Sequence, residues 1–164
     1  YEPPSASISG NIQTSNSQDI AGVTVRLLGA VSDSVLTDAS GDYLFTNLPL
    51  NQDYTLSFSK TNNTKNGVNI FDLILISDHI LGINPFSEPN QLLAADANSS
   101  STITGFDLVE IRKVILDVTN TFPIAPSWIF DDNDIFIQNL QTDLIFDVTG
   151  IKMGDVNFSA NPGN

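Results

Sequence analysis

The chain has 164 residues, of which 41% are hydrophobic, and its mean hydropathy of +0.04 is typical of a folded globular protein. Its 19 acidic and six basic residues give a net charge of −13, which disfavours binding to nucleic acid or to an anionic membrane. Cysteine is absent, so disulfides, thiolate nucleophiles and sulfur-based zinc sites are excluded, and no apolar run is long enough to predict a membrane span. The expected partners are cations.

Short β-rich runs separated by turn residues occupy the first third of the chain. The glycine of Asp38-Ala-Ser-Gly-Asp42 can supply the positive φ that a tight hairpin turn requires. This alternation predicts an all-β sandwich of the immunoglobulin-like type as a domain over residues 1–60. The predicted strands are 6–13, 22–28, 34–37, 43–48 and 54–59.

Apolar residues recur at helical spacing after residue 60. One predicted helix covers 70–81 and stops at Gly82, and a second covers 106–116. The two align at an offset of 35 positions, which indicates internal repeats at 61–82 and 96–118. The predicted second domain is 61–164, in which a helical pair is followed by a β or irregular extension at 119–164.

Oxygen-bearing side chains precede the second helix at the spacing of a calcium loop. Calcium takes six to eight oxygen ligands, and a 12-residue loop that enters a helix can wrap them around one ion. The alternative is a polar turn whose last carboxylate only caps the helix. The predicted ligands at loop positions 1, 3, 5, 7 (main chain), 9 and 12 are Asp96, Asn98, Ser100, Thr102, Thr104 and Asp107.

The pattern Val/Ile-Asn/Thr-x-x-Asp-Leu-x-x-Ile-x-x-x-Ile-Leu occurs in both repeats and resembles the duplicated segment of type I dockerins. The resemblance covers about residues 61–118. It implies a calcium-dependent module that attaches a secreted bacterial protein to a cohesin domain, as in cellulosome-like assembly for polysaccharide catabolism.

The first repeat departs from the dockerin pattern because its loop position 5 falls on Lys65, a cation. The terminal Gly154-Asp-Val-Asn157 resembles the sequence that opens the first dockerin loop. We therefore hypothesise a split site, against the alternative that the tail merely ends a surface strand. One or two calcium ions are expected. The ligands of this weaker site would be Asn66, Asn69, Asp72, Asp155 and Asn157.

The dockerin resemblance also suggests where a protein partner would bind. Dockerins carry a hydroxyl pair before the last ligand and a basic pair on the helix, and the matching positions here give the candidates. The alternative, which the sequence favours for the phenylalanines, is burial within this chain. We expect a monomer that binds a cohesin-like or other extracellular protein. The candidates are Ile70, Phe71, Phe106, Arg112 and Lys113.

Three stretches of the first domain resemble the prealbumin-like B-type repeats of Gram-positive surface adhesins and the related carboxypeptidase regulatory-like fold. They are Gly22-Val-Thr-Val-Arg-Leu27, Ser40-Gly-Asp-Tyr-Leu-Phe45 and Tyr54-Thr-Leu56. This resemblance implies a bacterial extracellular or cell-surface protein.

Catalysis is not expected, because the lone histidine, His79, lies on a predicted helix and a triad has few candidates without cysteine. The predicted function is a non-catalytic calcium-binding extracellular module for protein attachment. Two alternatives remain open: a calcium-rigidified spacer of a bacterial surface adhesin, and a carbohydrate-binding accessory domain.

Overall fold

The computed structural model describes residues 4–164, which form two compact units. The sandwich unit contains the described residues up to Ser59, residues 130–150 and Gly163. The second unit contains 60–129, 151–162 and Asn164. Each unit is therefore assembled from segments that are distant in the sequence.

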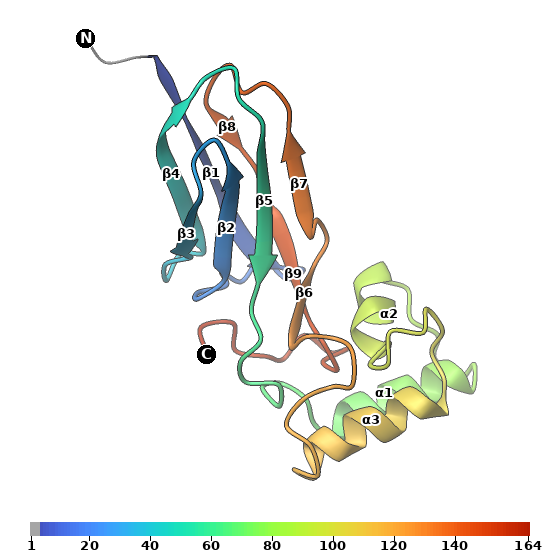
Figure 1. The fold of residues 1–164 in the computed structure, drawn as a ribbon. Coiled ribbons are helices and arrows are strands. Elements are labelled where there is room, and N and C mark those ends of the chain that lie inside the picture. The colour runs from blue at the N-terminus through green and yellow to red at the C-terminus, as the bar shows by residue number, and fades with distance from the viewer. Residues whose placement is uncertain (1–3) are drawn as a thin grey trace. The chain divides into compact units, whose positions relative to one another are not determined.

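The first sheet of the sandwich is built around the N-terminal strand, β1 (Figure 1). β1 pairs antiparallel with β4 and parallel with β8 and β9, so C-terminal strands lie beside the first strand of the chain. The order is β4-β1-β9-β6, with β8 also on β1. The strands are β1 (Ser5–Thr14), β4 (Asp42–Pro49), β6 (Trp128–Phe130), β8 (Leu144–Ile145) and β9 (Val148–Lys152).

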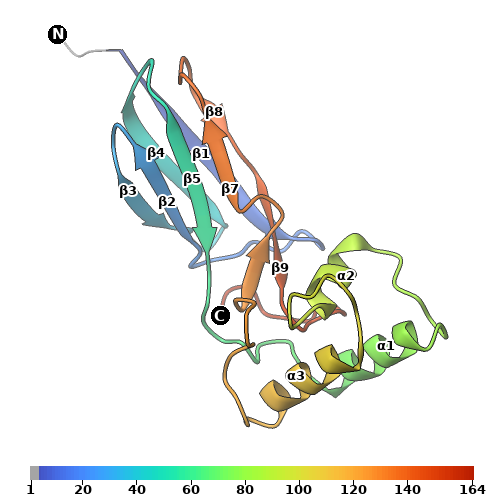
Figure 2. The ribbon, with the colours of Figure 1, turned by 45° about the vertical axis from the view of Figure 1, so that its right-hand side comes forward.

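The second sheet has the order β3-β2-β5-β7 and is entirely antiparallel (Figure 2). Burial alternates along β5, where Tyr54, Leu56 and Phe58 are buried, as expected of a strand with one face on a core. Gly41 has φ +73° in the turn before β4, as its sequence predicted. The strands are β2 (Thr24–Gly29), β3 (Asp33–Leu36), β5 (Tyr54–Ser59) and β7 (Asp134–Ile137).

The second unit contains the three helices, α1 (Ile70–Ile80), α2 (Pro89–Ala95) and α3 (Gly105–Ile115). α1 and α3 begin with the same device: Asn69 and Thr104 cap the first turn, and the aspartate three residues later bonds back to the cap backbone. Proline at the first position of α2 suits a helix start, because that residue has no intrahelical N–H bond to lose.

A separate hydrophobic core holds the second unit together. α1 and α3 contribute Ile76 and Ile111, which are fully buried, and the C-terminal segment contributes Met153 and Val156. The tail is thus a structural part of this unit and packs against the helices that carry the predicted ligands.

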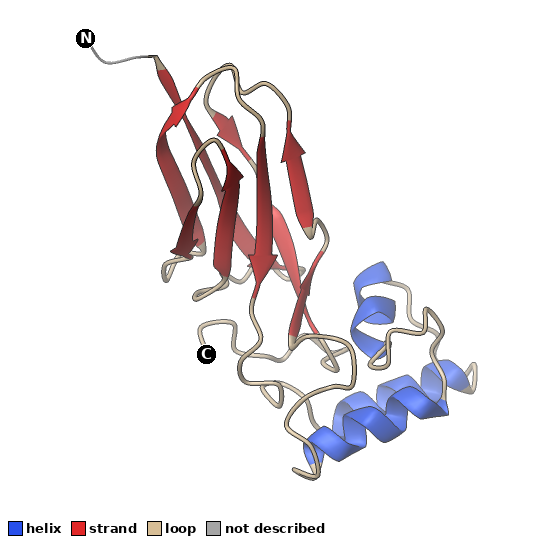
Figure 3. Ribbon diagram, viewed as in Figure 1, coloured by secondary structure: helices blue, strands red, loops and turns tan. Residues whose placement is uncertain are grey.

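The predicted fold class, an N-terminal sandwich followed by a dockerin-like helical pair and a C-terminal extension, is wrong (Figure 3). The chain is mostly a two-sheet β-sandwich with three helices of 7 to 11 residues, and no dockerin-like helical pair is evident in residues 4–164. The N-terminal β part fits the prediction. The error arose after residue 119, because the strands there are only two to five residues long and return to sheets begun by the N-terminal strands.

None of the helices formed by residues 4–164 combines the length and the apolar character that crossing a bilayer requires.

Candidate metal centre

The contiguous loop, residues 96–107, is folded around the side chains of Asp96 and Asn98. Asp96 Oδ1 accepts the Ser100 N–H at 2.8 Å, and its Oδ2 accepts the Ser101 N–H at 2.7 Å. Asn98 Oδ1 also accepts the Ser100 N–H, at 3.0 Å. Ser99 and Ser101 take positive φ values of 55° and 64°, so the backbone here curls tightly around the carboxylate.

The last predicted ligand, Asp107, closes this loop from the first turn of α3. Its carboxylate is fully buried, and Oδ1 accepts the Asn98 N–H at 3.2 Å while Oδ2 accepts the Thr104 N–H at 2.8 Å. Thr104 is the N-cap of α3, and Asp107 completes its capping box while also bonding to the loop. Capping does not account for the bond to Asn98.

The split loop is formed by residues 155–161 of the tail together with the start of α1. Asp155 Oδ1 accepts the Ser159 N–H at 3.0 Å, and Oδ2 accepts the Ala160 N–H at 2.7 Å. Asn157 Oδ1 accepts the same Ser159 N–H at 3.1 Å. This bonding repeats that of the contiguous loop atom for atom, at an offset of 59 residues.

Asp72 completes the split loop as Asp107 completes the contiguous one. Its buried carboxylate accepts the N–H of Val156 at 3.0 Å and of Asn157 at 3.4 Å through Oδ1, and that of Asn69 at 2.9 Å through Oδ2. The structure therefore brings together Asp72, Asn69, Asp155 and Asn157. Metal binding by this group stays a prediction.

Two residues of the split loop were missed from the sequence. Ser159 and the main chain of Asn161 occupy the places that Ser100 and Thr102 hold in the contiguous loop. Comparing Asp155-x-Asn-x-Ser159 with Asp96-x-Asn-x-Ser100 would have found them. Phe158 even repeats the positive φ of Ser99, at 57° against 55°.

Asn66 has a different place from the one predicted. Its Nδ2 donates to the Asn161 carbonyl at 2.6 Å, and its Oδ1 accepts the Asn161 N–H at 3.0 Å. A two-way amide clamp of this kind fixes the tail, so Asn66 holds the loop in place from outside. Gly67, with φ +77°, lies so close to Ala160 that a Cβ there would clash with the tail at 2.6 Å.

Burial shapes the electrostatics of the split loop. It raises the pKa of Asp72 to about 6, with the nearby Asp155 acting in the same direction and backbone N–H bonds opposing it. Burial also raises the pKa of Asp155, against backbone hydrogen bonds and the charge of Lys152. Burial thus disfavours the charged form of both neighbouring acids. A divalent cation between them would stabilise both carboxylates.

The donor set of each loop is oxygen only, which suits calcium rather than a softer metal. Within residues 4–164 no group of three or more acidic or histidine side chains is gathered for a metal. A cation in either loop would therefore rely on two carboxylates and on amide, hydroxyl and main-chain oxygens. Such a low charge count is typical of weak extracellular calcium modules rather than of tight cytosolic buffers.

The apolar partner candidates are exposed on the helices of the second unit. Ile70, Phe71 and Phe106 are 56%, 65% and 76% exposed, so the expectation that the phenylalanines pack within this chain is wrong. The helix starts explain this, since these residues precede the first inward-facing position, Asp72 or Asp107. Arg112 is exposed, and Lys113 pairs with Glu110 at 2.7 Å.

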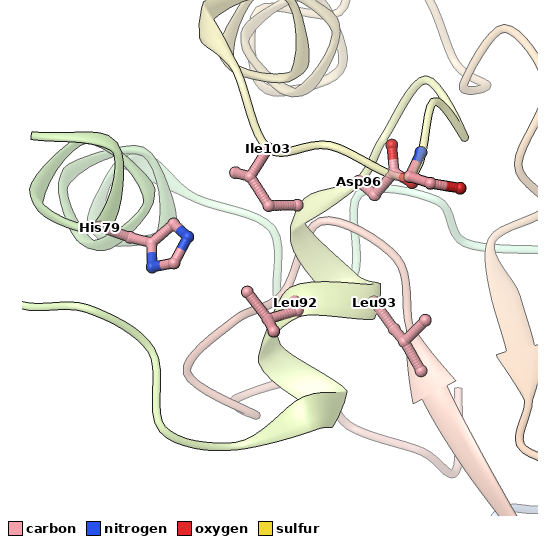
Figure 4. Close-up of a pocket in the computed structure, with 6 residues that line it drawn as sticks. His79, Leu92, Leu93, Asp96 and Ile103 are labelled. Atoms are coloured by element: carbon pink, nitrogen blue, oxygen red, sulfur yellow. The ribbon is translucent and has the colours of Figure 1, made fainter. Parts of the chain in front are cut away.

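His79 lies beside a pocket of about 430 Å³ in the second unit (Figure 4). Its ring faces Leu92 across the pocket and stacks on Phe86 at 4.5 Å, while Nδ1 accepts the Phe86 N–H at 2.9 Å. These contacts attach His79, in the last turn of α1, to the loop that follows the helix.

Residues 7–72 match the family described as carboxypeptidase regulatory-like domain, over less than half of the chain. The match confirms the predicted likeness of the N-terminal β-sandwich to that domain. It ends before the contiguous loop, and nothing in it supports the dockerin resemblance. No curated protein matches this chain.

Among solved structures, a C-terminal fragment of the pilus adhesin SpaC from Lactobacillus rhamnosus GG is 28% identical over 35% of this chain and 23% of its own, with a TM-score of 0.31. The Bacillus anthracis TIE protein is 9% identical over 90% of this chain and 16% of its own, with a TM-score of 0.44. A streptococcal ancillary pilin is 11% identical over 90% and 32%, with a TM-score of 0.41. The chain thus spans under a third of each of these proteins, and scores below 0.5 do not indicate a shared overall fold.

Proposed function

We propose that this chain is a non-catalytic structural spacer of a larger bacterial surface adhesin or other extracellular protein, rigidified by calcium in the contiguous loop and the split loop. The observation that carries the proposal is the repeated arrangement of Asp96 with Asp107 and of Asp155 with Asp72. In both loops the carboxylate at position 1 binds the N–H groups of positions 5 and 6, and the carboxylate at position 12 binds the N–H of position 3.

The burial of three of these four aspartates supports calcium over a purely polar turn. Asp72, Asp107 and Asp155 are at most 1% exposed, and a buried carboxylate is costly unless its charge is balanced. A turn needs a carboxylate only as a hydrogen-bond acceptor, which an exposed aspartate supplies at less cost. A bound divalent cation would balance two buried charges in the split loop and one in the contiguous loop.

A spacer role follows from what calcium would stabilise. The split loop joins the tail to the start of α1, so an ion there would link segments 83 residues apart, from Asp72 to Asp155. Binding to the folded form alone stabilises it by mass action, by about 2.7 kcal/mol at a hundred times the dissociation constant. The module would then be stiff in calcium-rich extracellular fluid.

Thermal unfolding tests the proposal directly. The intact chain, stripped of metal, would be melted in buffer alone, in millimolar calcium and in the same concentration of magnesium. We expect calcium to raise the Tm by several degrees and magnesium to do much less, since magnesium demands a stricter octahedral geometry. Equal melting curves in all three buffers would remove the basis of the proposal.

A second candidate, attachment to another extracellular protein, is favoured by the exposed apolar residues at the helix starts. Phe71 and Phe106 hold matching places in the two repeats and are largely exposed. Large exposed aromatic residues are frequent anchors of protein interfaces. Binding of secreted proteins to the intact chain, compared with its F71S/F106S variant, would distinguish attachment from a passive spacer.

A further inference from the structure

Lys152 is a buried lysine at the end of β9, three residues before the first ligand of the split loop. Its side chain is surrounded by protein, and the residue is only 3% exposed. Nζ donates to the Thr64 carbonyl at 2.6 Å and to the Met153 carbonyl at 3.1 Å. The ammonium group therefore bridges the tail and the segment that precedes α1.

Asp155 lies in the same turn as Lys152, because its N–H donates to the Lys152 carbonyl at 3.3 Å. Asp155 and Asp72 are both buried, and neither carboxylate forms an ion pair with the ammonium within 4 Å. Burial lowers the pKa of Lys152 to about 8, but the charges of Asp155 and Asp72 oppose that shift. A lysine buried with only carbonyl partners would be expected to lose its proton more readily. The ammonium and the two acids thus lie in the same buried region, where the split loop closes, and act on one another through space without a direct ion pair.

The contiguous loop has no counterpart to Lys152. The residue three positions before Asp96 is Leu93, which is 45% exposed. The two loops share the N–H bonds to their first and last aspartates, but at this position the split loop carries a full positive charge that the contiguous loop lacks.

We propose that Lys152 is an internal counter-cation that keeps the C-terminal segment 153–162 docked on the second unit in the absence of metal. The split loop then keeps its form without calcium, whereas the contiguous loop depends on the ion. The second part rests on the proposed function, because it takes the contiguous loop as a calcium site. The first part concerns the metal-free protein alone.

Hydrogen exchange of the intact chain in chelator tests the first part. In the wild type, the amides of Val156 and Ala160 should exchange at least about 10-fold more slowly than those of Asn98 and Ser101. In K152M this protection should fall by at least about 10-fold, since the variant loses both Nζ hydrogen bonds and leaves two buried acids without their nearby cation. K65M, which removes an exposed lysine paired with Asp117, is the matched control and should leave the tail amides unchanged.

Unchanged protection of Val156 and Ala160 in K152M would overturn the proposal. If K152M fails to fold in chelator, the K152M/D155N variant decides, because removing one buried acid lessens the need for the cation. Recovery of the fold in that variant supports the counter-cation, and no recovery contradicts it. Calcium added to the wild type and to K152M should slow amide exchange in the contiguous loop. If calcium slows exchange in neither loop, the proposed function is wrong, but the result in chelator still tests the role of Lys152.

Discussion

Asp72 Oδ1 accepts the backbone N–H of Val156 at 3.0 Å, although 84 residues separate the two along the chain. The same oxygen also accepts the Asn157 N–H at 3.4 Å, and Asp107 makes the corresponding bond to Asn98 at 3.2 Å, only nine residues away. The same local geometry is therefore made once from a continuous loop and once from two ends of the second unit. Metal binding in the split loop would therefore require the C-terminal segment 153–162 to be docked on α1.

The paired variants D96N and D155N should each abolish one calcium site and leave the other. Each replaces the first carboxylate of one loop with a neutral amide of nearly the same shape, so the loop loses its charge and one of the two N–H bonds that the carboxylate accepts. Calorimetric titration should find one ion per chain in each single variant and none in D96N/D155N. Two ions in D155N would show that the tail supplies no ligand.

The two helix caps offer a second matched pair. Asn69 Oδ1 accepts the Phe71 N–H at 2.9 Å, and Thr104 Oγ1 accepts the Phe106 N–H at 3.3 Å. In metal-free protein, N69A and T104A should each lower the free energy of unfolding by about 1 kcal/mol, the usual cost of losing such a cap. Urea denaturation measures this. A loss below the experimental error in both variants would mean that the caps do not stabilise the helices.

Two substitutions on α3 compare the stability contributed by a buried core residue with that contributed by an exposed one. Ile111 is fully buried on α3, whereas Val109 is 49% exposed two residues earlier. I111A should lose about 2–5 kcal/mol by leaving a cavity, and V109A should change stability by less than about 0.5 kcal/mol. Similar losses in both variants would contradict the burial assigned to α3.

The buried Asp72 predicts a pH dependence of the calcium-free protein. Its pKa is raised to about 6 in the fold by burial, so the folded form holds the proton more tightly than the unfolded chain does. The protonated Asp72 side chain therefore contributes stability that is fully present below about pH 4 and is lost as the pH rises through 6. The free energy of unfolding should fall by at most about 3 kcal/mol over this range. D72N cannot titrate there, so its stability profile between pH 4 and 7 should be flatter than that of the wild type. Parallel profiles would show that Asp72 is not responsible.

Much of the first unit could be predicted from the sequence, because local signals agree with the fold there. The strands predicted at 6–13 and 54–59 lie within a residue or two of β1 and β5, since alternation of burial along a strand is directly visible in the residues. The two helices at 70–81 and 106–116 were found for the same reason, at the helical period. The helix α2, only seven residues long, carried too short a pattern to detect.

What the sequence could not predict depends on contacts between distant segments. Strand β7 and the two-residue β8 form only by pairing with β5 and β1, and the local sequence of each does not indicate its partner. The split loop was partly accessible because Gly154-Asp-Val-Asn157 resembles the opening of a calcium loop. The clamp from Asn66 to Asn161 and the burial of Lys152 were not, since both depend on where the tail docks.

Calorimetric titration of the intact, metal-stripped chain with calcium is the most direct test of the account. We predict saturable binding of two ions per chain, with dissociation constants at or below about 1 mM, the range of extracellular calcium modules. The contradicting result would be heats no larger than those of dilution up to about 5 mM calcium. The oxygen atoms of the two loops would then only accept hydrogen bonds within their turns.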